Sequence, residues 1–402
     1  MTRKTLLLVL SACLAAACAK ETGIREIRPE EKPDLLPAMP VIHITTEGKK
    51  PVTDRETYIP ATFIFADDSD SREPVQGEIR ARGNSSWWNA QKKSYRIRLE
   101  NKEPVLGRTA NRHWVLIANY FDKTMLRNEL AFYLSRTSPG LKYTPESDFV
   151  EVIFNGEYLG VYQLVDHVRT GYGRVRDQYL LEIDVRAEET EATFTTPHCS
   201  VPIIVSEPDC TQGDEMWQEA SDFVLEAENR LFSGDLSLLD LDSFVDWYLI
   251  NEIAKNNDSI FFTSCFMSFT PGGKLSMGPV WDFDIAFGNT TYNDNDKEEG
   301  FWLMKAAWFD RLMKEKAFVD RVKARFAEFY AAQPQWYDYL DHYAAYLTPY
   351  IQLNEERWKT MNVTLWSNPY VFPTYEDYMK ELHRWLKTRM DWMKTEIDKI
   401  PS

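Results

Sequence analysis

The order of the secondary-structure signals along the chain is the feature that most restricts its fold. From about residue 40 to 210 the sequence contains short, partly alternating apolar segments that predict β-strands, among them VIHITT, ATFIFA, SYRIRLE and GVYQLV. One helix, at about 124–134, is expected to interrupt these strands. Asn155-Gly156 stands between two of the segments and predicts a tight hairpin turn.

The second half of the chain changes to helical spacing. Helices are predicted, with a loop and hairpin at 256–290 between them, at 214–232, 238–255 and within 301–400. Because strands come first and helices second, we predict an α+β fold with two lobes. The β-rich N-lobe would span 39–212 and the helical C-lobe 213–402.

The first residues have the composition of a secretory leader. Two basic residues precede an apolar stretch at 5–17, and Cys18 directly follows three alanines. This pattern resembles a lipoprotein signal, in which the cysteine is lipidated, and the stretch is shorter than the roughly 20 apolar residues that span a bilayer. We expect a signal peptide at 1–17, lipidation of Cys18 and a tether at 18–38. A cut before Cys13 would leave a very short apolar core, and a plain cleaved signal or an apolar helix is the alternative.

The net charge of the chain limits the classes of binding partner that are expected. With 46 Lys and Arg against 62 Asp and Glu, the chain has a formal net charge of -16. Nucleic acids need a basic face, so no nucleic-acid partner is expected. An acidic surface suits a soluble exported monomer, whose only membrane attachment would be the N-terminal lipid. The expected location is the cell envelope, at the outer membrane or the cell surface.

The remaining cysteines and the histidines offer little chemistry. Cys199 and Cys210 flank a β-like stretch and would form a disulfide in an oxidising compartment, or stay as two free thiols. A zinc site is not expected, because the chain has neither CxxC nor paired-histidine spacing. His113 and His167 stand beside apolar residues and are interpreted as structural.

Three polar clusters are candidates for chemistry, and the first is Asp282 with Asp284. They lie in WDFDIAFG, after a strand that is approached through a Gly-Gly turn. Carboxylates two residues apart at a strand end point to the same side. Mg²⁺ prefers one or two carboxylates together with substrate phosphates, so this pair is a candidate metal site. A polar turn capped by acids is the alternative.

The second cluster is Asn256-Asn257-Asp258, directly after the predicted helix at 238–255. Its loop leads into the hairpin that carries Asp282, so Asp258 and Asp282 are expected at neighbouring strand ends. Phosphoryl transfer needs one acid to position the hydroxyl nucleophile and another to hold Mg²⁺. The alternative is a helix C-cap formed by Asn257.

The third cluster is a basic hairpin at 79–99. A strand ends at Arg82, a Gly/Ser turn follows at 83–86, and Lys92 and Lys93 precede the next strand. Such a turn holds phosphate oxygens with its backbone N–H groups and a lysine. The side chains on one face of the second strand would be Lys92, Ser94, Arg96 and Arg98. An ordinary hairpin with a solvated basic face is the alternative.

Taken together, the three clusters resemble the CotH kinase family. The matching segments occur in the family's order over about 40 to 290, and they are RGNSSWWNAQKKSYRIRL, NYFDKTMLRNELAFYL, VEVIFNGEYLGVYQLVDH, YLLEID, SFVDWYLINEIAKNND and GGKLSMGPVWDFDIAFGN. The resemblance implies an atypical protein-kinase-like fold, with a β-rich N-lobe and a helical C-lobe around ATP and Mg²⁺. It also implies transfer of the γ-phosphoryl group of ATP to Ser or Thr of a protein.

The resemblance assigns roles to individual residues. Asp258 takes the catalytic position, Asp282 the metal-binding position, and Asp284 stands beside it. The residues implied to meet the nucleotide phosphates are Arg82, Gly83, Asn84, Ser85 and Lys93, with Ser86 completing the turn. Arg127 and Asn128 match motif positions whose role is structural or phosphate-facing.

The chain departs from the family's pattern at two places. Many relatives carry an Asn a few residues beyond the catalytic Asp, where this chain has Thr263-Ser264-Cys265, which puts binding of a second metal in question. Asp166 replaces a family Glu, so any lysine–acid pair is altered.

Other functions compete with the kinase. ATP is scarce outside the cytoplasm, and a fold does not fix an activity. A non-catalytic surface lipoprotein, an adhesin or a glycan- or protein-binding module, would use some of the 13 Trp and 20 Tyr to stack on its ligand. A glycoside hydrolase with two carboxylates is a third possibility, although the order of the motifs favours phosphoryl transfer.

Overall fold

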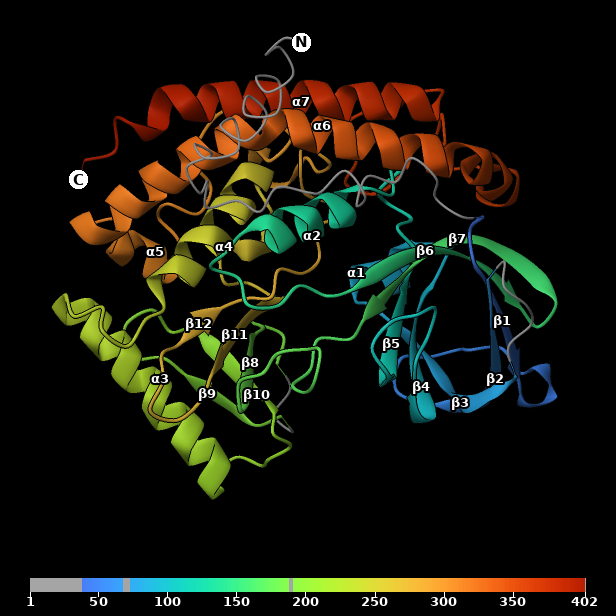
Figure 1. The fold of residues 1–402 in the computed structure, drawn as a ribbon, viewed down its shortest axis with the longest axis horizontal. Helices are drawn as coiled ribbons and strands as arrows, with labels where there is room; N and C mark the ends of the chain where they lie inside the picture. The colour runs from blue at the N-terminus through green and yellow to red at the C-terminus, as the bar shows by residue number, and fades with distance from the viewer. Residues whose placement is uncertain (1–37, 68–72, 188–190, 402) are drawn as a thin grey trace, which may run out of the picture.

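The computed structural model describes residues 38–67, 73–187 and 191–401, and the fold is α+β as predicted (Figure 1). Cys18 and the expected signal peptide lie outside the described residues, as does the expected tether except its last residue. Within these ranges, no helix combines the length and the apolar composition needed to cross a membrane.

The first half of the chain forms a closed barrel of seven strands. In order around the barrel they are β1 (Val41–Thr46), β2 (Ile59–Ala66), β3 (Val75–Arg82), β4 (Ser94–Glu103), β5 (Asn111–Ile117), β7 (Glu157–Asp166) and β6 (Ser147–Phe154). The parallel pair of β1 and β6 closes the barrel, and the other pairs are antiparallel.

Alternation along each strand explains the barrel interior. On β4, Tyr95, Ile97 and Leu99 are buried inside, whereas Arg96 and Arg98 point outward. The predicted turn between β6 and β7 is confirmed: Asn155 has φ 52° and Gly156 φ 91°, the positive values that a type I′ hairpin requires. A basic outer face on β3 and β4 follows from this pattern.

A second, open sheet has strands from both sides of the predicted lobe boundary at 212. Its order is β12 (Ser276–Met277), β11 (Cys265–Phe269), β8 (Tyr179–Ile183), β10 (Pro202–Glu207) and β9 (Thr193–Thr195). β8 pairs with β10 on one side and with β11 on the other. The strands at 179–207, expected in the N-lobe, therefore join the predicted 256–290 hairpin rather than the barrel.

Helices cover the second sheet and one end of the barrel. They are α1 (Ser85–Asn89), α2 (Arg127–Thr137), α3 (Glu215–Ser233), α4 (Leu241–Ala254), α5 (Ala307–Leu312), α6 (Lys316–Trp358) and α7 (Tyr375–Ile397), with 3₁₀ turns at Glu47–Lys49, Asn257–Ser259 and Tyr292–Asp294. α3 begins where Asp214 accepts a hydrogen bond from Trp217 N, and ends at Gly234 in the left-handed region. α6 and α7 run side by side, and α6 reaches β7 of the barrel (Figure 1).

Helix α4 is the centre of the helical half. Every residue from Ser243 to Ala254 is buried, so this helix is enclosed on all sides, its polar members Asp246, Asn251 and Glu252 included. It packs against α2, α6, α7 and β12. Its C-terminus is therefore fixed from several directions, and that end carries the segment with Asp258.

Candidate active site

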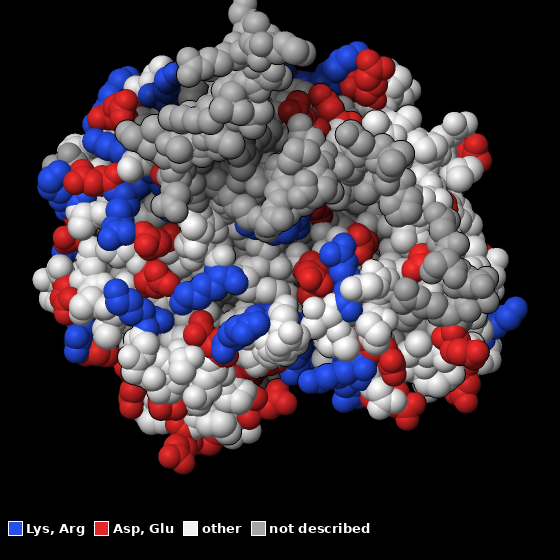
Figure 2. Space-filling model, in the orientation of Figure 1, with Lys and Arg blue, Asp and Glu red and all other residues white. Residues whose placement is uncertain are grey.

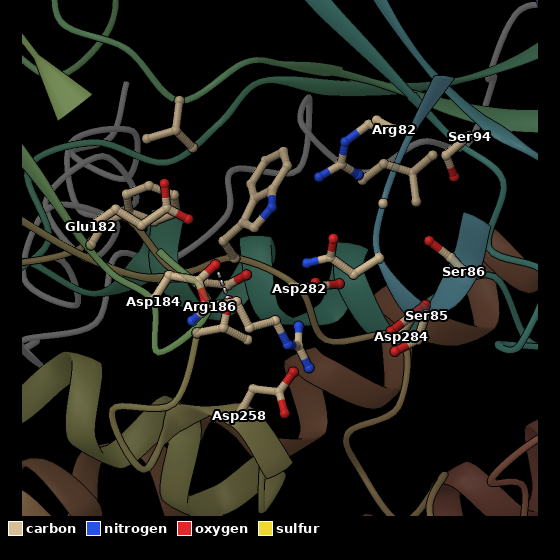
Figure 3. Close-up of a pocket in the computed structure, with 18 of the residues that line it drawn as sticks. Arg82, Ser85, Ser86, Ser94, Glu182, Asp184, Arg186, Asp258, Asp282 and Asp284 are labelled. Atoms are coloured by element: carbon tan, nitrogen blue, oxygen red, sulfur yellow. Dashed lines mark hydrogen bonds between the residues drawn. The ribbon is translucent and has the colours of Figure 1, made fainter. Parts of the chain in front are cut away.

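A cavity of about 840 Å³ lies where the outer face of the barrel meets the second sheet. It is lined by seven of the eight residues predicted for nucleotide, metal and catalysis: Arg82, Gly83, Asn84, Ser85, Asp258, Asp282 and Asp284. Figure 3 shows Asp282 near the middle, with Glu182 and Asp184 to one side and Ser85 and Ser86 to the other. The structure thus brings together residues that are up to two hundred positions apart in the sequence.

Asp282 stands in a strained turn that two asparagines hold. Its φ of 65° places it in the left-handed region, which is uncommon for a residue other than glycine. Nδ2 of Asn256 donates to the carbonyl of Asp282 at 3.3 Å. The backbone N–H of the next residue, Phe283, donates to Oδ1 of Asn128 at 2.7 Å. These bonds fix the backbone on both sides of the carboxylate.

Asp258 is held at the end of α4. The helix ends at Lys255, which has left-handed backbone angles, and a 3₁₀ turn with Asp258 at its centre follows. Asn256 caps this turn by accepting from Asp258 N, and Nδ2 of Asn257 donates to Oδ1 of Asp258 at 2.9 Å. The pKa of Asp258 is raised to about 6, mainly by burial and also by the negative charge of Asp282.

Burial disfavours the charged forms of the carboxyl groups in the site. Burial raises the pKa of Asp282, although Arg82 and Arg186 oppose the rise. Burial raises the pKa of Asp284 well above its usual range, and the charge of Asp282 acts in the same direction. A cation between them would reverse these shifts by favouring the charged forms.

The donor set fits a cation that shares its ligands with a substrate. Among the described residues, no group of three or more His, Cys, Asp and Glu side chains is placed to hold a metal ion. Mg²⁺ normally takes only one or two carboxylates and completes its shell with water and phosphate oxygens. Asp282 and Asp284 therefore suit Mg²⁺ in the presence of phosphates better than a protein-only metal cage.

The predicted phosphate-binding turn lines the cavity and depends on glycine. Gly83 has φ 94°, and a Cβ at this position would lie 2.0 Å from Oγ of Ser86. Arg55 donates to the carbonyl of Gly83 and to the side chain of Asn84. The turn is thus fixed from behind, while the hydroxyl groups of Ser85 and Ser86 are on the cavity side.

Lys93 is a correction to the prediction. Its ammonium donates to the carbonyls of Trp87 and Ala90 and lies 4.9 Å from the Trp87 ring centre, so it closes the end of α1. The neighbouring Lys92 lines the cavity instead, buried and bonded to Val161 O and Asn354 Oδ1. Burial lowers the pKa of Lys92 to about 7.

Three polar residues at the end of β8 were not predicted to form part of the site. Glu182, Asp184 and Arg186 line the cavity. Oδ2 of Asp184 accepts a hydrogen bond from Oγ1 of Thr263 at 2.8 Å. Thr263 belongs to the segment Thr263-Ser264-Cys265, where the chain departs from the family's pattern. The signal that could have found the acids is their spacing, because Glu-x-Asp after an apolar strand repeats the pattern of Asp282 and Asp284.

A comparison with protein families decides the affiliation of the chain. Residues 79–393 match the family model described as CotH kinase protein. The chain belongs to the CotH kinase family. A search of the curated proteins found no match.

The CotH match runs from β3 to α7 and contains every residue predicted for the cavity. It extends about a hundred residues beyond the segments that carried the resemblance, which ended near residue 290. The helices α5, α6 and most of α7 therefore belong to the same family unit as the cavity.

The CotH motif residues Arg127 and Asn128 have supporting roles. Arg127 and Asp122 form a fully buried ion pair at 2.6 Å, and Arg127 also donates to Ala286 O at 3.1 Å. Asn128 holds the Asp282 turn through Phe283 N. The sequence left open whether Arg127 and Asn128 are structural or face the phosphates. Their contacts are those of structural residues.

Asp166, the other departure, pairs with an arginine. Its Oδ1 lies 3.1 Å from Arg174, and Asn111 donates to it at 3.2 Å.

Nearby, burial and the surrounding arginines lower the pKa of His113 to about 3 and that of His167 well below its usual range. His113 is therefore neutral at physiological pH, and so is His167, which lines the cavity.

The cysteines and the surface complete the comparison with the sequence. Among the described residues, Cys199, Cys210 and Cys265 are all free thiols, so the disulfide alternative for the first two is wrong.

Acidic and basic side chains are interspersed over the described part of the face in Figure 2. The net negative charge is not gathered into one patch on that face.

Proposed function

We propose that the chain is a Mg²⁺-dependent protein kinase of the CotH type, which transfers the γ-phosphoryl group of ATP to Ser or Thr of a protein. One observation carries the proposal. Asp258, from the end of α4, and Asp282, from the turn after β12, meet the Gly83–Ser86 turn of the barrel in one cavity. Phosphoryl transfer needs this combination of a base, a metal-holding acid and a phosphate-binding turn. The proposal includes a kinase-like arrangement of the barrel and the helical half as two lobes.

Each side chain has a defined task in this proposal. Asp258 orients the substrate hydroxyl and accepts its proton, and Asp282 with Asp284 holds the metal. Mg²⁺, when bound, would neutralise charge on the phosphates. The hydroxyl groups of Ser85 and Ser86 and the guanidinium of Arg82 bind phosphate oxygens. The charges of Asp282 and Asp284 act on Arg82, which supports a role for its guanidinium next to the proposed metal site.

The test uses the full chain with Mg²⁺, a general protein substrate and ATP labelled on either the γ- or the α-phosphorus. We expect transfer of the γ-label alone, with loss of at least a hundredfold in Asp258→Asn and Asp282→Asn. Asp222→Asn, on the exposed face of α3, is the matched control and should behave as wild type. Undiminished transfer in both cavity variants would refute the site.

The binding-module alternative has narrower support. Trp88 and Tyr172 are 72% and 84% exposed and could stack on a ligand. The largest aromatics are instead in the core, where Trp114, Trp247, Trp308, Trp336 and Trp385 are fully buried. Saturable binding of a glycan or protein that Trp88→Ala abolishes and Asp282→Asn leaves intact would favour this alternative.

We also propose that the protein acts in the cell envelope, attached through a lipid on Cys18. The support is the leader sequence alone. Cells given labelled palmitate should incorporate the label into the wild-type chain and not into Cys18→Ser. Equal labelling of the two would rule out this anchor.

A further inference from the structure

The floor of the cavity contains an acid between two apolar side chains. Glu182 on β8 is in register with Ile204 on β10 and with Phe266 on β11. Residues directly opposite each other on neighbouring strands share one face of the sheet, and all three line the cavity. Their strand neighbours Leu181 and Ile183 face the hydrophobic core. The floor is thus a row of apolar, acidic and apolar side chains.

The roof opposite this row is the outer face of β3 and β4. Arg82 pairs in register with Ser94, and both line the cavity together with Arg96. Nε of Arg96 is buried and meets no hydrogen-bond partner among the described residues. The charges of Arg82 and Arg96 both act on Glu182, so roof and floor face each other. A guanidinium plane is a good stacking partner for a flat aromatic ring.

The two ends of the cavity suit different parts of a nucleotide. Ser85 and Ser86 lie on one side of Asp282, and Glu182 lies on the other (Figure 3). If the phosphates occupy the side with the Gly83–Ser86 turn, the base reaches the side with Glu182. A base needs apolar or stacking groups against its faces and hydrogen-bonding groups at its edge, and the row and its roof supply both.

We propose that Arg96 and the row Ile204–Glu182–Phe266 form the base subsite of the nucleotide, and that Glu182 selects adenine over guanine. This inference rests on the proposed function. A neutral carboxyl group has one donor and one acceptor. It therefore matches adenine, which presents the N6 amino donor beside a ring-nitrogen acceptor. A carboxylate only accepts, and it matches the paired N–H donors of guanine N1 and N2.

The surroundings of Glu182 favour its neutral form. Its pKa is raised to about 8, mainly by burial and also by the charges of Asp184, just after the same strand, and of Glu191 before β9. Arg82 on β3 and Arg96 on β4 act in the opposite direction. Other titratable or charged groups that line the cavity wall around the row are His167, Arg169, Glu207, Asp209 and Cys210.

The test is calorimetric binding of ADP and GDP to the full chain, without divalent cations, at pH 6.5 and 8.5. Wild type should prefer ADP at pH 6.5. Because a group of pKa about 8 is mostly ionised at pH 8.5, the ratio of ADP to GDP affinity should fall about fourfold or more. Glu182→Gln, which keeps a donor and an acceptor at every pH, should retain the preference for ADP and lose its pH dependence.

Arg96 and Arg98 form a matched pair for the roof. They stand two residues apart on the outer face of β4, but Arg98 is paired with Glu78. Arg96→Gln should weaken the binding of both ADP and GDP, by about tenfold for ADP at pH 6.5, because both bases lose the stacking guanidinium. It should also move the pH transition of the ratio upward, since one opposing positive charge is gone. Arg98→Gln should match wild type in both respects.

The outcomes separate this inference from the proposed function. If wild type binds ADP but Glu182→Gln has the same ratio and pH dependence, the base subsite is refuted and the kinase proposal stands. If wild type binds neither nucleotide at either pH, with or without Mg²⁺, both proposals fail.

Discussion

At the scale of the single residue, Asp258 links the structure to a pH dependence. Its pKa is raised to about 6, so its ionised form, which can accept a proton, is lost as pH falls through that value. Bound Mg²⁺ lowers the pKa of nearby acids, so we expect kcat/KM to rise with pH with a midpoint no higher than about 6. Initial rates between pH 4.5 and 8 at saturating Mg²⁺ would measure this. A midpoint above 7 would assign the base to another group.

Asp282 gives a second prediction, which separates function from stability. Asp282→Asn removes one of several buried carboxylates that repel each other, so the melting temperature without metal should stay within a few degrees of wild type. Wild type should gain about 2.7 kcal/mol from Mg²⁺ and ADP at a hundred times their dissociation constant, and the variant should gain far less.

Thermal unfolding with and without Mg²⁺ and ADP measures both quantities. Asp222→Asn on α3 controls for the loss of an exposed acid. A collapse of Asp282→Asn in the absence of metal would show that the carboxylate serves the turn rather than a ligand.

At the level of single residues, the sequence indicated which acids share the cavity better than it indicated the direction of each side chain. Asp282 and Asp284 both line the cavity, but they do so from a turn after β12 in which Asp282 has φ 65°, so the alternation of a strand end is not the reason. The prediction that Lys93 faces the cavity was wrong, because the residue precedes β4, where α1 and a bend set the direction of the chain. Its neighbour Lys92 lines the cavity instead. Glu182 was missed because its strand pairs with a partner more than eighty residues away.

At the scale of the secondary-structure element, α2 sets the position of the turn that carries Asp282. Asn128→Ala would leave the buried N–H of Phe283 without its acceptor, at a cost of about 1–3 kcal/mol, and would loosen the backbone of Asp282. We expect Mg²⁺ affinity in the presence of ADP to fall about tenfold, as measured by calorimetry.

Asn128→Asp is the informative companion variant. It keeps the oxygen that accepts from Phe283 and loses the donor to Asn119. Near-normal Mg²⁺ affinity in Asn128→Asp beside a large loss in Asn128→Ala would assign the effect to the turn. Equal losses in both would point to general disruption of α2.

Elements with strong local signals were predicted within a few residues. The expected helix at 214–232 is α3, and the expected helix at 238–255 is α4. The helix at 124–134 begins later, at Arg127, because Asp122 and Thr124 form a hydrogen-bonded turn before it. Closure of the barrel was not predicted, since the pairing of β1 with β6 depends on contacts a hundred residues apart.

At the scale of the whole molecule, α7 joins the helical half into one unit. Arg389 is fully buried and lies 2.8 Å from Glu252 of α4, which also accepts from Trp302 N and Leu303 N. Removing one partner of a buried ion pair costs about 3–5 kcal/mol. Arg389→Met should therefore lower the free energy of unfolding by that amount.

Denaturant unfolding followed by circular dichroism and by tryptophan fluorescence would measure this loss. Lys387→Met is the control, because Lys387 lies two residues before Arg389 on the same helix and its ion pair with Asp391 is exposed. This substitution should lower the free energy of unfolding by less than about 1 kcal/mol. A similar small cost for Arg389→Met would show that α7 only covers the surface of the helical half.

The closed barrel also bears on how this protein meets its neighbours in a crowded compartment. Seven strands that bond around a full circle leave no row of open amide and carbonyl groups for another polypeptide to extend. In the open sheet, the two outermost positions belong to β9 and β12, of three and two residues. Strand-by-strand aggregation would have to start from these short borders, so the native chain is poorly suited to seed it.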